Sequence, residues 1–224
     1  MSSSHAESQS RLILLLIAGT PVVIILAASW LWYFVIQGNL DLVGSIGTSN
    51  NGKLITPPRQ IEQVSFRDDT GVPFVWADLE RRWTMVIVNR GQECDAACER
   101  RLYFTRQVHI ALGKEFNRVQ RIFINDRPIA SSTVAVPEGD LSGWPKQLQG
   151  DSLAEYLTTA HQGLVPLAVS SDAVLAQFPE LGENATQWFL IDPAGWIMMS
   201  FDDSLDYKAV MADLKFLLKH SGGA

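Results

Sequence analysis

The stretch Trp83–Leu102 constrains the fold most, because it joins a strand-like apolar run to the chain's only two cysteines. Residues 83–88 are apolar or β-branched without polar alternation, which is typical of a central strand buried on both faces. Beyond Gly91, apolar residues recur at roughly three- and four-residue steps from Cys94 to Phe116, as in an amphipathic helix. The sequence therefore predicts a strand, a loop and a helix, with the cysteine pair where the helix starts.

The predicted helix gives the two cysteines different roles. Cys94 is expected near the first turn, where unpaired N–H groups and the helix dipole stabilise a thiolate. We therefore predict Cys94 as the nucleophile and Cys98 as the resolving thiol of a redox pair, or both as ligands of a metal. A disulfide that only staples the helix, or two buried apolar side chains, are the structural alternatives. Charged neighbours of both signs leave the stabilisation of a thiolate open: Glu93, Asp95 and Glu99 against Arg90, Arg100 and Arg101.

The amino-terminal part of the chain contains a long apolar segment. Residues 12–36 carry no charged side chain, and at about 1.5 Å per helical residue such a segment reaches roughly 37 Å, enough to span a bilayer. Trp30, Trp32 and Tyr33 lie toward its far end, as interfacial aromatic residues do. Ala27-Ala-Ser resembles a signal-peptidase site, but the apolar run continues beyond it and exceeds the usual hydrophobic region of roughly 7–15 residues. We therefore predict one uncleaved transmembrane helix over residues 12–36.

The flanking charges and composition predict how the chain is divided. Arg11 precedes the apolar segment and the next basic residue is Lys53, so the positive-inside rule places the tail, residues 1–11, in the cytoplasm. Residues 37–59 are rich in Gly, Asn, Ser and Pro and predict a linker. Residues 60–220 have the length of one globular domain. In a bacterium this domain would be periplasmic and anchored to the inner membrane, where paired cysteines can oxidise and persist.

The order of the predicted elements indicates an α/β fold. The segment Arg118–Asp126 predicts a second strand after the cysteine helix, and strand–helix–strand implies a right-handed crossover and a parallel pair. Residues 61–77 predict a β-hairpin before this unit, and residues 187–201 predict an antiparallel hairpin after it. Asp206–His220 predicts a closing amphipathic helix. The domain is therefore expected to have a mixed sheet with helices on its faces.

The charge and the cysteine content exclude several classes of protein. The net charge is -6 and the pI is near 5.2, and no basic cluster is present, so nucleic acid is not an expected partner. Two cysteines are too few for a disulfide-scaffolded fold. A structural zinc site would require a second cysteine pair, which the sequence lacks.

The element order and three local motifs resemble the Sco/SenC family of cytochrome c oxidase assembly proteins. Phe66–Leu79 is similar to the opening hairpin of that family, Cys94-Asp-Ala-Ala-Cys98 has its Cys-x-x-x-Cys spacing, and Phe189–Gly195 is similar to its late strand and turn. The resemblance covers residues 61–219 and implies a thioredoxin-like domain, a central mixed sheet flanked by helices, after one transmembrane helix. It also implies partners at the inner membrane, namely a cytochrome c oxidase subunit or other assembly factors.

The same resemblance implies copper, with Cys94 and Cys98 as Cu(I) ligands. The copper-binding histidine of the family is expected shortly before the Asp-Pro-x-Gly turn, where this sequence has Asn184. An amide is a poor copper ligand, and two thiolates alone suit Cu(I) but not Cu(II). Among the histidines, His161 is the candidate replacement, because it lies in a loop region before a predicted strand, whereas His109 lies several turns beyond the cysteines. The pattern therefore favours a redox role of the dithiol over a metal role.

Three functions are compatible with these features. In the first, the anchored domain assists assembly of the copper site of cytochrome c oxidase through Cys94 and Cys98, by thiol–disulfide redox or by transient Cu(I) transfer. In the second, it is an enzyme, a general periplasmic thiol–disulfide oxidoreductase with many substrates. In the third, it is a non-catalytic interaction or chaperone module, and the disulfide only stabilises the fold.

Overall fold

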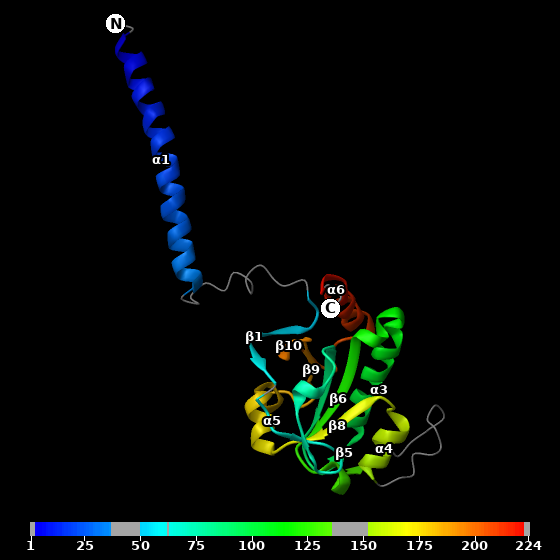
Figure 1. The fold of residues 1–224 in the computed structure, drawn as a ribbon. Coiled ribbons are helices and arrows are strands. Elements are labelled where there is room, and N and C mark those ends of the chain that lie inside the picture. The colour runs from blue at the N-terminus through cyan, green and yellow to red at the C-terminus, as the bar shows by residue number, and fades with distance from the viewer. Residues whose placement is uncertain (1–2, 37–49, 62, 136–151, 222–224) are drawn as a thin grey trace. The chain divides into compact units, whose positions relative to one another are not determined.

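The computed structural model describes residues 3–36, 50–61, 63–135 and 152–221, which belong to two compact units, Met1–Ser49 and Asn50–Ala224. The first unit contains a single described element, helix α1 (Ser3–Ile36), which includes Pro21 (Figure 1). The helix expected over residues 12–36 is therefore present, and it begins earlier, within the segment predicted as a cytoplasmic tail. Among the described residues, no helix combines the length and the apolar character that a membrane crossing requires.

The second unit is built on a mixed eight-stranded sheet with the strand order β1-β10-β9-β4-β6-β8-β2-β3. A separate two-stranded sheet pairs β5 with β7 in parallel. The strands are β1 (Lys53–Gln60), β2 (Phe66–Arg67), β3 (Pro73–Phe74), β4 (Trp83–Asn89), β5 (Glu93–Cys94), β6 (Val119–Asn125), β7 (Thr133–Val134), β8 (Leu164–Ala168), β9 (Trp188–Ile191) and β10 (Trp196–Phe201). The helices are α3 (Ala96–Ala111), α4 (Leu153–Ala160), α5 (Ser171–Gln177) and α6 (Tyr207–His220), with the short 3-10 helices η1 (Trp76–Asp78), η2 (Gly113–Arg118), η3 (Ile129–Ser131) and η4 (Pro179–Gly182).

The central strand is β4, and every one of its residues is buried. It pairs in parallel with β6, from Trp83 opposite Val119 to Asn89 opposite Asn125, and antiparallel with β9. The predicted parallel strand–helix–strand unit is therefore confirmed. The hairpin of β9 and β10 and the small hairpin of β2 and β3 are confirmed as well. A strand covered on both faces needs no polar alternation, which explains its continuous apolar sequence.

Helices cover both faces of the sheet, as the mixed α/β prediction required. Figure 1 shows α3 and α4 on one side of the sheet and α5 on the other. Successive residues of β4 point to opposite faces, so Met85 packs with residues of α3 and α6, whereas Val86 packs with residues of α5 and η4. A third apolar cluster joins β4 and β6 to α4 and contains both cysteines.

The predicted linker differs from the structure in its last third. Residues 53–60 form β1, which pairs antiparallel with β10 at the edge of the sheet, so the domain starts before residue 60. Residues 37–49 of the expected linker lie outside the described part. The Pro57-Pro58 sequence predicted a linker, but an edge strand tolerates proline because its outer N–H positions need no partner. These prolines coincide with the register shift between Leu54 and Arg59.

Candidate redox site

The cysteine loop leaves the carboxyl end of β4 and is fixed by buried polar side chains. Asn89 donates from Nδ2 to the backbone oxygen of Glu93 (3.2 Å) and to Oδ1 of Asn125 (3.0 Å). Gly91 has a φ of +110°, a conformation that other residues rarely adopt, and its N–H donates to Oδ1 of Asp126 (2.6 Å). The ends of β4 and β6 thus position the loop from both sides.

Cys94 and Cys98 form a disulfide with a Cα–Cα distance of 5.2 Å. Cys94 was expected near the first turn of the helix; it lies just before the helix, in β5, next to the capping residue Asp95. The carboxylate of Asp95 accepts a hydrogen bond from the backbone N–H of Cys98 (2.8 Å), so α3 begins at Ala96. Asp is a preferred N-cap because its short side chain satisfies such an N–H group. The sequence contained this signal, but Asp95 was interpreted only as a charge near the thiols.

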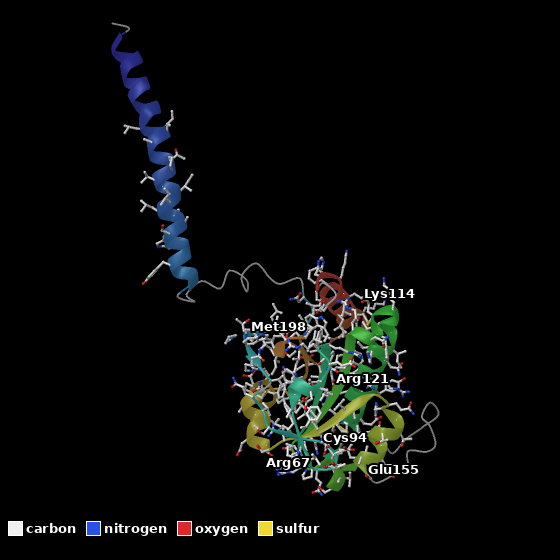
Figure 2. The ribbon with its side chains drawn as sticks, viewed as in Figure 1. Arg67, Cys94, Lys114, Arg121, Glu155 and Met198 are labelled. Atoms are coloured by element: carbon white, nitrogen blue, oxygen red, sulfur yellow. A yellow bond between two sulfur atoms is a disulfide. The ribbon has the colours of Figure 1, made fainter. Side chains whose placement is uncertain are left out.

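Both cysteines are 0% exposed, because residues 129–135, which we name the strap, cover them together with α4. The strap is held by backbone hydrogen bonds from Thr133 N to Gln92 O (2.8 Å) and from Ala135 N to Cys94 O (2.9 Å). Cys94 lies toward the end of the domain that also carries Arg67 and Glu155 (Figure 2). A thiol or disulfide partner therefore reaches the sulfur atoms only when the strap or α4 moves.

His161, the predicted third ligand, is buried and belongs to a hydrogen-bonded chain with Tyr156 and Glu99. The Tyr156 hydroxyl donates to Oε1 of Glu99 (2.9 Å), and Nε2 of His161 lies 3.1 Å from the same hydroxyl. Because the phenolic proton points to Glu99, Nε2 of His161 donates to Tyr156. Nδ1 of His161 has no hydrogen-bond partner among the described residues. The structure thus gives the imidazole a partner other than the cysteines.

Burial is the largest cause of the pKa shifts of Glu99, Tyr156 and His161, the three hydrogen-bonded residues. It raises the pKa of Glu99, against the lowering effects of the Tyr156 hydrogen bond and Arg100. Burial also raises the pKa of Tyr156, and Glu99 raises it further. The pKa of His161 falls to about 3, mainly through burial and additionally through the positive charges of Arg121 and Arg106. His161 is therefore neutral in the folded protein at ordinary pH.

This pKa predicts acid-sensitive stability. The folded-state pKa of His161, about 3, lies below its unfolded value of 6.5, so the unfolded chain binds the proton first. The contribution of neutral His161 to the free energy of unfolding is complete above pH 6.5. It is lost as the pH falls from 6.5 toward 3, and at pH 5 the free energy of unfolding is lower by about 2 kcal/mol. The free energy of unfolding, measured with urea, should therefore decrease less from pH 7 to pH 5 in His161→Gln than in the wild type. His220→Gln, an exposed control, should keep the wild-type loss, and an unchanged loss in His161→Gln would contradict the assignment.

Asn184, at the position where the Sco/SenC resemblance implies a copper-binding histidine, also has hydrogen-bond partners of its own. Oδ1 of Asn184 accepts hydrogen bonds from the N–H (2.9 Å) and the hydroxyl (2.7 Å) of Thr186. In the part of the chain that the structure describes, no group of three or more His, Cys, Asp or Glu residues could hold a metal ion. Within residues 50–61, 63–135 and 152–221, the donor set near the loop is therefore two thiolates after reduction, which suit Cu(I) better than Cu(II).

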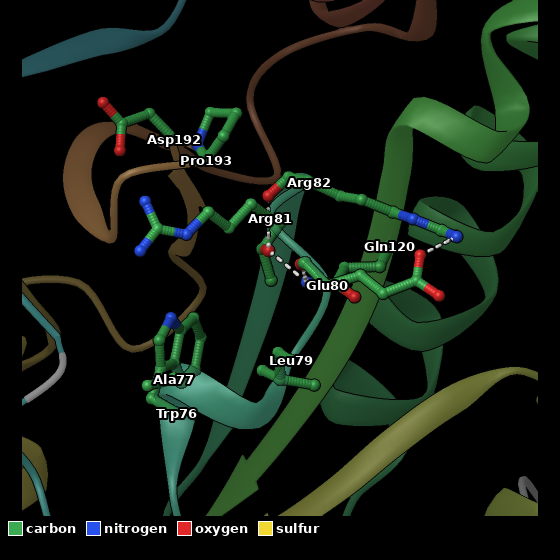
Figure 3. A pocket seen from close by; sticks show the side chains of 10 residues that line it. Trp76, Ala77, Leu79, Glu80, Arg81, Arg82, Gln120, Asp192 and Pro193 are labelled. Atoms are coloured by element: carbon green, nitrogen blue, oxygen red, sulfur yellow. Dashed lines mark hydrogen bonds and ion pairs between the residues drawn. The ribbon is translucent and has the colours of Figure 1, made fainter. Parts of the chain in front are cut away.

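A small cavity lies at the opposite end of β4 and is not part of the redox site (Figure 3). Its volume is about 20 Å³, room for about one water molecule. Gln120 donates from Nε2 to the backbone oxygen of Glu80 (3.2 Å), and Glu80 forms an ion pair with Arg82. These contacts fix the backbone just before β4. None of the residues that line the cavity is a cysteine or histidine.

Comparisons with known proteins agree with this architecture. Yeast Sco1 matches with 17% sequence identity and a TM-score of 0.51, over 80% of this chain and 100% of that chain. Yeast Sco1 with copper bound matches with 17% identity and a TM-score of 0.50, over 78% of this chain and 96% of that chain. At these identities the likeness concerns the fold, and at that level the Sco/SenC resemblance is confirmed.

No curated protein matches the sequence at a significant level. The sequence matches the family described as transmembrane-like, thioredoxin-like, C-terminal domain over residues 83–143 and 147–221. This match includes β4, the cysteine pair and every later helix and strand of the domain. The chain therefore belongs to the transmembrane-like, thioredoxin-like C-terminal domain family.

Proposed function

We propose that this protein is a membrane-anchored thioredoxin-like factor that assists assembly of the copper site of cytochrome c oxidase by thiol–disulfide exchange. The observation that carries the proposal is the Cys94–Cys98 disulfide at the carboxyl end of the central strand and the start of α3. In open α/β sheets, functional sites gather at this edge. The oxidase connection comes from the Sco/SenC resemblance, which the shared fold supports.

In the proposed reaction, the reduced protein donates two electrons to a disulfide of its partner. The Cys94 thiolate attacks one sulfur of that disulfide, which forms a mixed disulfide and releases the other partner sulfur as a thiolate. The Cys98 thiolate then attacks Sγ of Cys94 and displaces the second partner thiolate. The partner leaves with two reduced cysteines, able to bind copper, and this protein is left as the Cys94–Cys98 disulfide. A thiol reductant of the same compartment returns it to the dithiol.

The short loop supports exchange over a structural staple. The two cysteines are separated by only 4 positions, and closing so short a loop stabilises a fold by about 2 kcal/mol in the chain-entropy treatment. A domain of this size has a large apolar core of its own and does not depend on such a contribution. Exchange chemistry therefore accounts for the pair better than stability does.

Copper enters the proposal as a transferred ion. One of the structural relatives, yeast Sco1, has a structure with copper bound. In this chain Asn184 stands where the family's histidine is expected, and His161 is bound to Tyr156. Two thiolates can hold Cu(I) for transfer, but redox chemistry needs only the pair that the structure contains. We therefore place thiol–disulfide exchange first and Cu(I) transfer second.

The proposal includes an anchor in a bacterial inner membrane, with the domain on the periplasmic side. Residues 12–36 contain no charged side chain, and α1 extends over all of them. The described apolar side chains of α1, such as Leu15, Val23 and Ile25, are exposed, as expected of a helix whose partner is lipid. Arg11 before this segment supports a cytoplasmic amino terminus.

Trapping of a mixed disulfide tests the exchange function. Reduced Cys98→Ser protein is mixed with the soluble copper-site domain of an oxidase subunit whose cysteine pair is oxidised, and the products are resolved by mass. A covalent adduct through Cys94 is expected, because the resolving thiol is missing. Cys94→Ser should form no comparable adduct, and the wild type should yield reduced partner. No adduct with either variant contradicts the proposal, and equal adducts with unrelated disulfide peptides favour a general oxidoreductase.

A Cu(I) titration against a competing chelator tests the second candidate function. One-to-one binding by the reduced wild type, lost in both Cys94→Ser and Cys98→Ser, supports Cu(I) transfer. His161→Ala should leave the affinity unchanged, because its imidazole is bound to Tyr156. Absence of binding by the fully reduced protein excludes the transfer function and leaves exchange.

A further inference from the structure

A cavity of about 140 Å³ lies beside the cysteine loop, between the start of α3 and the loop that follows η4. Two residues between the cysteines, Asp95 and Ala97, form part of its wall. Its lining also includes Leu181 of η4, Ala185 and Thr186 of the loop after η4, and Val88, Asn89, Arg90 and Arg101. This is several times the volume that one water molecule needs, so a side-chain terminus fits.

Arg101 is the unusual member of this wall. It is only 6% exposed, and its Nε has no hydrogen-bond partner among the described residues. Arg101 lies one helical turn beyond Ala97, and helical side chains lean toward the amino terminus of their helix, so the guanidinium reaches toward the start of α3. A buried guanidinium with an unpaired donor is unfavourable unless an acceptor arrives.

The charges around Arg101 leave its donors available. Burial lowers its pKa, and Asp203 and Asp95 act on it electrostatically without a hydrogen bond that would satisfy Nε. Asp95 uses one carboxylate oxygen to cap α3. Arg90 adds a second positive charge to the wall. A planar guanidinium pairs best with a carboxylate, which can accept two parallel N–H bonds.

We propose that this cavity is a binding site for a carboxylate group, held by Arg101, and that the carboxylate belongs to an Asp or Glu side chain near the partner's disulfide. This second part rests on the proposed exchange function. Because Asp95 and Ala97 line the cavity, a partner segment anchored there lies against the cysteine loop. The site would select partners with an acidic residue close to their cysteines.

Two matched disulfide peptides test the selection. They differ only in an Asp or an Asn beside the cysteine, and their exchange rates with the reduced full chain in detergent micelles are compared. The wild type should favour the Asp peptide by about tenfold. Arg101→Gln should abolish the preference, and Arg101→Lys should keep part of it. Arg100→Gln, the neighbouring exposed arginine, removes the same charge and should keep the preference. Equal losses in the two Gln variants would show a long-range charge effect and overturn the site.

A second arm does not depend on redox chemistry. The Arg101 Nε–H resonance of the oxidised protein is followed by NMR during titration with a cysteine-free Asp peptide, its Asn counterpart and acetate. A saturable shift with the Asp peptide, absent with the Asn peptide, establishes the carboxylate site even if no exchange occurs, in which case the exchange function fails. Saturation by acetate at equal concentration assigns the site to a free carboxylate. Exchange without peptide preference and without any Nε–H shift overturns the inference and leaves the exchange function standing.

Discussion

Reduction of the Cys94–Cys98 disulfide in the folded protein is expected to be at least about 100 times slower than reduction of an exposed disulfide. Both cysteines are 0% exposed, so a reductant must wait for their cover to open, and we expect the strap to be the part that opens. Opening breaks the hydrogen bonds of Thr133 and Ala135 and exposes apolar side chains. An opening free energy of about 3 kcal/mol, ordinary for local unfolding, lowers the rate by about two orders of magnitude.

The strap can be weakened without touching the cysteines. Val134 is buried over the disulfide. Val134→Ala should lower the free energy of opening the strap by about 1 kcal/mol, because less apolar surface is buried. Reduction should then be roughly fivefold faster. Val72→Ala, at an exposed position, should leave the rate unchanged. The measurement follows thiol release under excess dithiothreitol with a thiol-reactive dye. A wild-type rate equal to that of an exposed model disulfide would show that the strap does not control access.

Replacement of Asp213 by Ala is expected to lower the free energy of unfolding by about 3 kcal/mol. The buried carboxylate accepts hydrogen bonds from the N–H of Asn51 (2.9 Å), its Nδ2 (2.9 Å) and the N–H of Gly52 (2.7 Å). It thereby fixes the start of the domain to α6. Gly52 suits this junction, because a Cβ there would lie 2.6 Å from the Phe201 ring and 2.7 Å from Sδ of Met199, so these side chains would have to move.

Thermal unfolding of the full chain, followed by circular dichroism, measures this effect. A loss of about 3 kcal/mol corresponds to a fall of roughly 6–12 °C in Tm for a domain of this size. Asp69→Ala, an exposed aspartate, is the matched control and should change Tm by less than about 1 °C. A fragment that begins at Lys53 should be destabilised like Asp213→Ala, whereas one that begins at Asn50 should not. An unchanged Tm in Asp213→Ala would contradict the role of this junction.

The sequence was informative where one physical effect dominates a continuous stretch. The apolar run of β4 is typical of a buried strand, and the apolar spacing of α6 indicated an amphipathic helix. The cysteine pair at the end of β4 followed from these neighbours. The edge strand β1 was missed because Pro57-Pro58 is equally typical of a linker and an edge.

The features that surround the cysteines required the structure. β5 and β7 are two residues long, too short for a periodic pattern, so the strap left no signal in the sequence. The hydrogen bonds that join Glu99, Tyr156 and His161 depend on the packing of α4 beside α3, a tertiary contact between distant segments. Arg101 follows Glu99 and Arg100 in the sequence and suggests a solvated charge, whereas the helix turns it into the cavity.

The redox equilibrium of the cysteine pair tests the exchange function most directly. The full chain in detergent micelles is equilibrated with dithiothreitol buffers of graded potential, thiols are counted by alkylation and mass, and circular dichroism follows the fold. The account predicts one reversible two-electron transition of a protein that stays folded, with a midpoint above about -300 mV, where exchanging disulfides lie. Thiols that appear only below that potential, or only as the domain unfolds, would show that the disulfide is structural and contradict the exchange function.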